Sequence, residues 1–262
     1  MEQTHELAAP APGEKAAELY SNILGDLPAF PPLAMRLAEL AGSRDAQIEE
    51  VTELLRSDAA LSADLLRRAN SPAYGFASRI DTLQQALVLL GFDELRRVAL
   101  ASATTSFSGP ALQAPELRLC WRHSLAVALL AEELARGTGI SPERAYTAGV
   151  LHDIGRLGLL TARPEQFGEL LREATDAGPI EDSSYFLERE AETFGFDHTE
   201  AGRWLAERWE MPVELRAVAG RHHDRASGAD LDLLMLIQHA VLTADALGFG
   251  LTPAVEGLDP KE

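Results

Sequence analysis

The sequence predicts an all-α protein in which an N-terminal helical lobe precedes a second helical lobe. Apolar residues recur at the spacing of a helix face in almost every segment between residues 19 and 250. Alternating apolar and polar runs, which mark half-buried strands, are scarce. A stretch containing Pro and Gly at residues 108–115 is the best internal boundary. We therefore expect lobes over residues 19–110 and 111–250, with a mobile tail at 1–18 and a second tail at 251–262.

In the first lobe, apolar residues three, four or seven positions apart mark each expected helix. Leu61, Leu65 and Ala69 share one face, and the run that begins at Asn70 with Asn-Ser-Pro ends that helix. The run Gly-Phe-Asp, which ends at Asp93, separates two further helical segments, and Asp93 can cap the second. The expected helices of this lobe cover residues 33–41, 48–55, 61–69, 82–90 and 94–106.

The composition is that of a soluble globular protein, with 46% hydrophobic and 24% charged residues in a chain of 262. The formal net charge of −18 disfavours non-specific nucleic-acid binding and docking on anionic membranes. Cys120 is the one cysteine, which fits a reducing compartment. The first residues lack the features of a signal peptide, and no apolar run approaches the ~20 residues of a membrane span. We expect a cytoplasmic protein.

Histidines concentrate in the second lobe, where all but His5 are found. His123 lies on a segment that is apolar nearly all round, so we expect a central, buried helix. His152 shares a face with small residues on a helix that starts at Ser141, a cap followed by proline. Asp153 follows directly, and Gly155 can end that helix.

Two further histidines are expected at helix ends. His198 falls in the first turn of a helix that Asp197 caps, with Glu200 completing a capping box. His222 ends the next helix and lies on its apolar face. In the last helix, Asp245 projects from an apolar face. A buried carboxylate without a partner is costly, so it is normally paired or neutralised.

A divalent metal ion would provide a common partner for these side chains. Imidazole and carboxylate together suit Fe, Mn, Zn or Ni. Taken singly, each histidine is more often a hydrogen-bonded core or surface residue than a ligand, and a backbone amide could satisfy Asp245. His239 faces away from Asp245 and is interpreted as structural. The candidate ligands on these grounds are His123, His152, Asp153, His198, His222 and Asp245.

The order of these residues resembles that of the HD superfamily of metal-dependent phosphohydrolases. The run from Leu151 to Arg156 is similar to the signature His-Asp doublet of that superfamily. The resemblance implies a site for one or two ions. A one-metal site would use His123, His152, Asp153 and Asp245. The extra ligands of two-metal members, such as the HD-GYP phosphodiesterases, correspond to His198, His222 and His223.

The first lobe indicates one branch of the superfamily, because it resembles the HDOD (HD-related output) domain. The most specific feature is the Asn-Ser-Pro-x-Tyr-Gly run at residues 70–75. The resemblance covers roughly residues 20–250 and implies an N-terminal helical lobe ahead of an HD-type lobe. The stretches that carry it are residues 27–31, 54–61, 67–75 and 86–91.

The HDOD resemblance implies a bacterial signalling or regulatory module that acts through protein partners. The pairs Arg67-Arg68 and Arg96-Arg97 are candidate contact residues, although an Arg pair on a solvated helix is ordinary. The alternative is a metal-dependent phosphohydrolase, in which Asp153 would bridge two metals and Arg156 would contact a phosphorylated small-molecule ligand. Arg156 could equally be a cation near a helix C-terminus.

Three departures from the HD-GYP pattern weigh against cyclic-dinucleotide hydrolysis. The Gly-Tyr-Pro element is missing after Asp224. Arg156 replaces the usual lysine after the His-Asp doublet, and Leu119 stands where some HD-GYP proteins have an acidic ligand. We therefore expect hydrolysis to be weak or absent.

Overall fold

A computed structural model describes residues 14–28, 31–41, 46–75, 79–108, 115–176, 184–225 and 231–251. Within these ranges the chain forms helices and no strand, which confirms the predicted fold class. The chain divides into two compact units, one of residues 29–107 and one of residues 1–28 with 108–262. The segment before residue 29 therefore clusters with the C-terminal unit, whereas the sequence analysis assigns residues 19–28 to the N-terminal lobe.

The smaller unit contains α2 (Pro32–Ala41), α3 (Ile48–Arg56), α4 (Ala59–Ala69) and α5 (Leu83–Ser108). Their apolar faces form a core, and Leu37, Leu55 and Leu65 are fully buried in it. Gly91 interrupts α5 with a positive φ of 79°, a conformation that glycine adopts without steric cost. The break between two helical segments falls where the sequence predicts it.

Two polar contacts support the smaller unit, one between Asn70 and Ile80 and one around Glu94. The Asn70 side chain accepts a hydrogen bond from the Ile80 backbone nitrogen at 2.9 Å and donates to the Ile80 carbonyl at 2.7 Å. The Asn of the Asn-Ser-Pro run therefore fixes the chain after α4. The largely buried carboxylate of Glu94 pairs with Arg68 and also lies 3.9 Å from Arg97. Arg96 is fully buried, so it is not available as the exposed partner contact that the sequence suggests.

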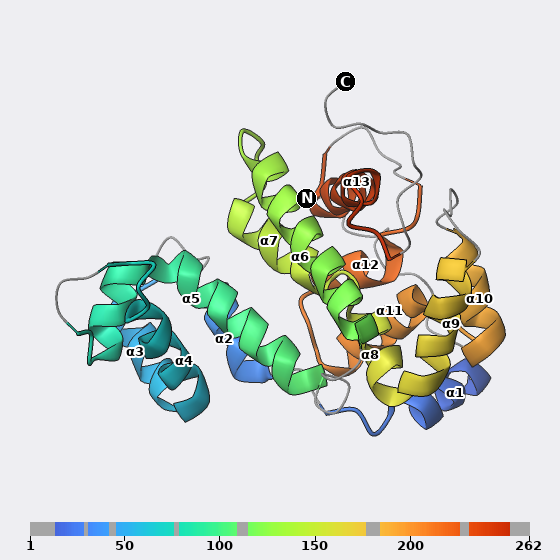
Figure 1. Cartoon of the computed structure of the whole chain (residues 1–262), viewed down its shortest axis with the longest axis horizontal. Helices are drawn as coiled ribbons and strands as arrows, with labels where there is room; N and C mark the ends of the chain where they lie inside the picture. Colours follow the sequence, from blue (N-terminus) through green and yellow to red (C-terminus); the bar gives the residue numbers. More distant parts are fainter. Residues whose placement is uncertain are drawn as a thin grey trace, which may run out of the picture. The chain divides into compact units, whose positions relative to one another are not determined.

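The larger unit is built around α6, which packs against α7 and α13, as Figure 1 shows. A second layer is formed by α11, which packs on α8 and α12. The helices of this unit are α1 (Glu14–Leu24), α6 (Pro115–Ala135), α7 (Pro142–Leu151), α8 (Ile154–Ala162), α9 (Pro164–Asp176), α10 (Ser184–Phe194), α11 (His198–Arg208), α12 (Val213–Arg221) and α13 (Leu233–Ala246).

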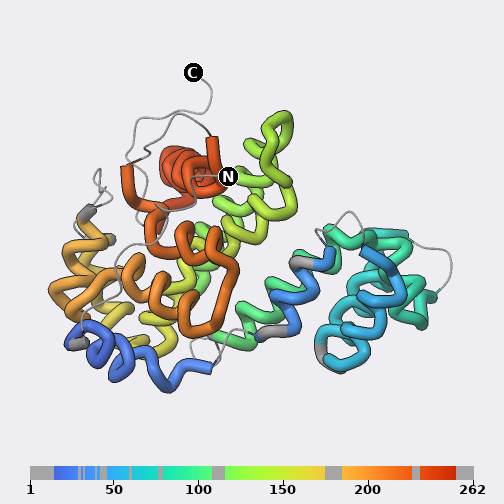
Figure 2. The backbone as a smooth tube through the Cα atoms, turned by 180° about the vertical axis from the view of Figure 1, so that it is seen from behind, coloured from blue at the N-terminus to red at the C-terminus, as the bar shows by residue number. Residues whose placement is uncertain are grey.

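Helix α1 belongs to this unit because its apolar face packs against α8 and α11, and Figure 2 shows it in blue at the edge of that unit. The Tyr20 hydroxyl donates to Glu200 Oε1 at 3.1 Å, and its ring meets Phe196 edge-on at 4.7 Å. The helix begins at Glu14, inside the segment assigned to a tail. Residues 1–13 and 252–262 lie outside the described residues, and His5 is among them.

Two glycines, Gly149 and Gly155, allow pairs of helices in the larger unit to approach closely. A Cβ on Gly149 would lie 2.5 Å from Ala128 Cα, so α7 approaches the backbone of α6 directly. A Cβ on Gly155 would clash with the backbone of His198 and Gly202, so α8 approaches α11 in the same way. The sequence analysis expects Gly155 to end a helix, which is wrong, because α7 ends at Leu151 and Gly155 lies inside α8. Its role is close packing.

The helix that carries His123 is less enclosed than its composition suggests. Val127, Ala128 and Ala131 are fully buried, but Leu125 is 43% exposed and Leu129 is 49% exposed. The expectation that α6 is buried nearly all round is therefore wrong for the face that carries these two leucines. No helix of the described residues combines the length and apolar character needed to cross a bilayer.

Candidate metal centre

The candidate ligands come from helix ends and from the middle of α6. His123 lies in α6, and His152 and Asp153 form the sharp turn between α7 and α8. His198 begins α11, capped by the predicted Asp197 capping box, and His222 is the C-cap of α12. Asp153 occupies the N-cap position of α8 but makes no side-chain cap hydrogen bond, so its carboxylate is available to the centre. These ligand side chains are nearly inaccessible, with at most 3% of any of these residues exposed: His123, His152, Asp153, His198 and His222.

Each buried imidazole is held through its Nδ1 atom. Nδ1 of His152 lies 2.7 Å from the Gly149 carbonyl, and Nδ1 of His222 lies 3.1 Å from the Val218 carbonyl. Nδ1 of His123 lies 3.2 Å from the carbonyl of Phe249. Because a carbonyl only accepts, each of these Nδ1 atoms carries the proton. The Nε2 atoms are then left with lone pairs, which is the state that binds a metal.

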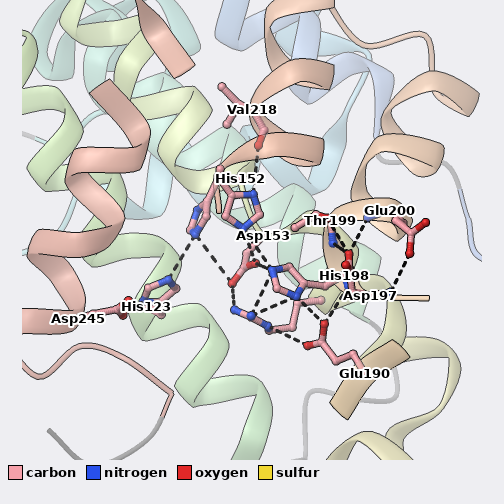
Figure 3. Close-up of polar contacts among 12 residues, drawn as sticks. His123, His152, Asp153, Glu190, Asp197, His198, Thr199, Glu200, Val218 and Asp245 are labelled. Atoms are coloured by element: carbon pink, nitrogen blue, oxygen red, sulfur yellow. Dashed lines mark hydrogen bonds and ion pairs between the residues drawn. The ribbon is translucent and has the colours of Figure 1, made fainter. Parts of the chain in front are cut away.

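The fourth buried histidine is held by a carboxylate that the sequence analysis does not identify. Glu190 Oε2 lies 2.5 Å from Nδ1 of His198 and accepts the backbone N–H of the same residue at 2.8 Å. Glu190 is fully buried, on α10. A sequence signal for it exists, because Phe186, Glu190 and Phe194 fall four residues apart and place the carboxylate in an apolar stripe. Figure 3 shows Glu190 beside His198.

The free Nε2 atoms converge around Asp153, which lies between His152 and His198 in Figure 3. Nε2 of His198 and Nε2 of His222 are 3.2 Å apart, and each lies 3.4 Å from Asp153 Oδ1. Nε2 of His152 lies 3.3 Å from Nε2 of His123 and 3.8 Å from Asp153 Oδ2. Contacts between two lone pairs are repulsive unless a cation lies between them. The arrangement therefore has the form of a ligand cluster.

Burial keeps His123, His152 and His222 neutral near pH 7. Desolvation lowers the pKa of His123 to about 4. It also lowers the pKa of His152, well below its usual range, and that of His222. Burial alone would raise the pKa of Asp153, but the Arg156 guanidinium beside it holds that pKa well below its usual range. Because His123 and His152 are both uncharged, no proton neutralises the contact between their Nε2 atoms.

Arg156 is buried inside the centre, with 3% of the residue exposed. Its guanidinium pairs with Asp153 Oδ2 and lies 3.4 Å from Glu190 Oε1. One terminal nitrogen lies 3.2 Å from each of the two ring nitrogens of His198. Burial alone would lower the pKa of Arg156, but the two carboxylates raise it. Arg156 lies in the first turn of α8, so it is not a cation at the C-terminus of that helix.

The remaining predicted ligands lie at the edges of the cluster. His223 packs edge-on to the His198 ring, with centroids 5.0 Å apart, and its ligand atom lies within 4.8 Å of those of His198 and His222. Asp245 is exposed and lies apart, with Oδ1 3.6 Å from Nδ1 of His123, on the side away from His152. Burial raises the pKa of Asp245 to about 6. His239 is exposed, and its Nδ1 lies 2.7 Å from the Met235 carbonyl of its own helix.

The residues present fit a divalent metal ion. Two groups of side chains place their ligand atoms within 4.8 Å of one another: His123, His152 and Asp153, and His198, His222 and His223. Asp153 Oδ1 is buried and has no hydrogen-bond donor among the described residues, which is costly unless a cation meets it. Imidazole nitrogen with carboxylate oxygen is a donor set for transition metals. The described residues therefore include His and Asp groups that could bind metal.

Comparison of the sequence with known protein families identifies the family to which this chain belongs. The model of the HDOD domain matches residues 27–225, and the chain belongs to the HDOD family. A curated relative, an uncharacterized protein of Treponema pallidum (strain Nichols), is 25% identical over 214 residues. The match covers 80% of this chain but 40% of that relative, so this chain spans less than half the length of the Treponema protein.

Two solved structures share the fold. An HDOD domain protein of unknown function from Geobacter sulfurreducens matches with a TM-score of 0.73 at 27% identity, over 94% of this chain and 83% of that chain. A proposed phosphohydrolase from Shewanella amazonensis SB2B matches with a TM-score of 0.64 at 28% identity, over 87% and 81% of the two chains. The all-α architecture is thus that of known HDOD proteins.

Proposed function

We propose that this chain is a metal-binding regulatory module of bacterial signal transduction that relays a signal through contacts with partner proteins. Membership of the HDOD family supports this role. The observation that carries it is the burial of Arg156 between Asp153 and Glu190, inside a cluster that is nearly inaccessible to solvent. A phosphate ester would have to break a buried ion pair to reach the guanidinium, and breaking such a pair costs about 3–5 kcal/mol.

In this function the metal couples helices. His123, His152, Asp153, His198, His222 and His223 would hold the ion, which would be Fe, Mn, Zn or Ni. A bound divalent ion supplies positive charge and Lewis acidity to the cluster. The chain's own residues prepare the cluster: three backbone carbonyls and Glu190 hold each Nδ1 proton and direct each Nε2 inward. Because the ligands come from α6, the α7–α8 turn, α11 and α12, binding would stabilise their packing.

Signalling partners would contact exposed helices. The Arg67 side chain on α4 is 75% exposed and pairs with its helix neighbour Asp64. It is the better candidate contact of the first Arg pair, because Arg68 is engaged by Glu94. In the second Arg pair, the Arg97 side chain is 35% exposed, whereas Arg96 is buried. The proposed partner surface of the smaller unit therefore centres on Arg67.

A second candidate is a metal-dependent phosphohydrolase of the HD superfamily. The near-complete convergence of the ligand set favours it, and so does the likeness to the proposed phosphohydrolase from Shewanella amazonensis at 28% identity. In this case the ion would activate water, and Asp153 would orient it. Arg156 would have to leave Asp153 to bind a phosphorylated substrate.

Turnover measurements distinguish the two functions. Metal-loaded wild-type protein is assayed with phosphodiesters, cyclic dinucleotides and nucleotides beside Asp153→Ala. A regulatory module gives no turnover that depends on Asp153. A turnover number near the ~1–10³ s⁻¹ typical of enzymes, abolished by Asp153→Ala, would establish the phosphohydrolase. Glu192→Gln, an exposed change on α10, is the control for preparation effects.

A further inference from the structure

We propose that Arg156 takes the place of a second cation, so that the centre holds a single metal ion on the side of His198 and His222. This inference rests on the proposed metal binding and goes beyond it, because the ligand set by itself would serve either one or two ions. The two oxygens of Asp153 carry the argument, since a carboxylate that bridges two ions must give one oxygen to each.

The two oxygens of Asp153 have different environments. Oδ2 accepts from the Arg156 guanidinium, whereas Oδ1 is buried and has no donor among the described residues. Oδ1 faces Nε2 of His198 and Nε2 of His222 at 3.4 Å each. Oδ2, the oxygen nearer to His152, is already committed to a cation. Oδ1 of Asp153 can therefore bind a metal ion, whereas Oδ2 is already paired with the Arg156 guanidinium.

The open side has the dimensions of a metal site. Oδ1 and the two Nε2 atoms form a triangle with sides of 3.4, 3.4 and 3.2 Å. In a tetrahedral complex with bonds of about 2.0–2.1 Å, ligand atoms are separated by about 3.3–3.4 Å. His223 lies within reach as a fourth ligand. On the other side, Nε2 of His152 lies 3.3 Å from Nε2 of His123, but it lies 3.8 Å from Oδ2, so the carboxylate is the more distant ligand there.

Charge balance also favours one ion. Two buried ion pairs of the centre join the guanidinium of Arg156 to the carboxylates of Asp153 and Glu190, and these three groups sum to one negative charge. One divalent ion leaves a single positive charge, and ionised Asp245, near His123, offsets it. A second divalent ion would leave two further positive charges beside a buried guanidinium. Uncompensated buried charge is strongly unfavourable.

Cobalt(II) titration of the full chain, after treatment with a chelator, tests the proposal. Visible absorption reports coordination of Co²⁺, and elemental analysis of the dialysed protein gives the number of ions per chain. We expect one ion in the wild type and in Arg156→Lys, which keeps the charge. We expect two ions in Arg156→Gln. His222→Ala should lose the ion, whereas His123→Ala should retain it.

Several outcomes overturn the inference while leaving the proposed metal binding intact. These are two ions in the wild type, one ion in Arg156→Gln, or an ion that is lost in His123→Ala but kept in His222→Ala. Failure of every protein to bind Co²⁺, Mn²⁺ or Zn²⁺ would overturn both proposals. If Arg156→Gln does not fold by circular dichroism, the double variant Arg156→Gln with Glu190→Gln removes one buried charge of each sign. It should also bind two ions.

Discussion

Glu190 accepts two hydrogen bonds from His198, one from Nδ1 of the ring at 2.5 Å and one from the backbone nitrogen at 2.8 Å. Both side chains are fully buried. One carboxylate on α10 therefore holds both the start of α11 and the ring that begins it. Carboxylates that hold the second nitrogen of a metal-binding histidine make the imidazole a better ligand and fix its orientation.

Glu190→Gln should weaken metal binding by about 10–100-fold, the usual cost of losing such a partner. The amide is neutral, so it makes His198 less basic and leaves Arg156 with one carboxylate. Isothermal titration of the metal-free protein with Zn²⁺ measures the change in affinity. Glu192→Gln is the matched control, because Glu192 is exposed and lies on the same helix. Equal affinities of both variants for Zn²⁺ would show that Glu190 does not position His198.

Gly155→Ala should destabilise the protein by about 3 kcal/mol or more, at or above the upper end for overpacking. The new Cβ would clash with the backbone of His198 and Gly202, and backbone atoms cannot move aside as a side chain can. Urea unfolding followed by circular dichroism measures the change in the free energy of unfolding. Gly139→Ala is the control, since a Cβ there meets nothing within 4 Å. A loss below about 1 kcal/mol in Gly155→Ala would mean that α8 and α11 can separate cheaply.

The helices could be predicted because their signals are local. The capping box at Asp197, the Ser141 cap and the break at Gly91 all lie within a few residues of the feature that they determine. The capping box also placed His198 correctly at the start of its helix, and the apolar face placed His222 at the end of its helix. Local hydrogen bonds and the pattern of apolar residues are sufficient for such features.

Long-range partners of charged side chains could not be predicted. Arg156 is a long cation of a type that usually reaches solvent, and its burial depends in part on a carboxylate that the fold brings near. Glu190 meets Arg156 from 34 residues away along the chain. The role of Gly155 could not be predicted either, because a glycine near a helix end can either end the helix or permit close packing of two helices. Only the position of α11 decides between the two.

Arg67 and Arg68 should differ in their effect on stability, although they are neighbours in sequence. Arg67→Ala removes a largely exposed side chain, so the free energy of unfolding should change by no more than about 0.5 kcal/mol. Arg68→Ala deprives the largely buried Glu94 carboxylate of a partner and should cost about 1–3 kcal/mol. Thermal or urea unfolding of both variants provides the comparison. Equal stability of the two variants would contradict the assignment of Glu94 to Arg68.

Acid should destabilise the metal-free protein through its buried histidines. Burial lowers the pKa of His123 from 6.5 to about 4, and it lowers the pKa of His152, His222 and His223 as well. Between the two values the unfolded chain binds more protons than the folded chain. The free energy of unfolding therefore falls as the pH drops from about 6.5 to about 4, by on the order of 3 kcal/mol from His123 alone. Urea unfolding in chelator across this range measures the slope.

Asp245 should make the free energy of unfolding depend on pH in the opposite direction to the histidines, which provides a check on the sign of both effects. Burial raises its pKa from 3.8 to about 6, so across this window the folded chain binds more protons at Asp245 than the unfolded chain. Its contribution to stability therefore falls as the pH rises from about 4 to about 6. The effect is smaller than that of His123, because the Asp245 side chain is 43% exposed and water screens it. Asp245→Asn should steepen the dependence of the unfolding free energy on pH, and His123→Gln should flatten it. If both substitutions change the slope in the same direction, at least one of the two assigned shifts has the wrong sign.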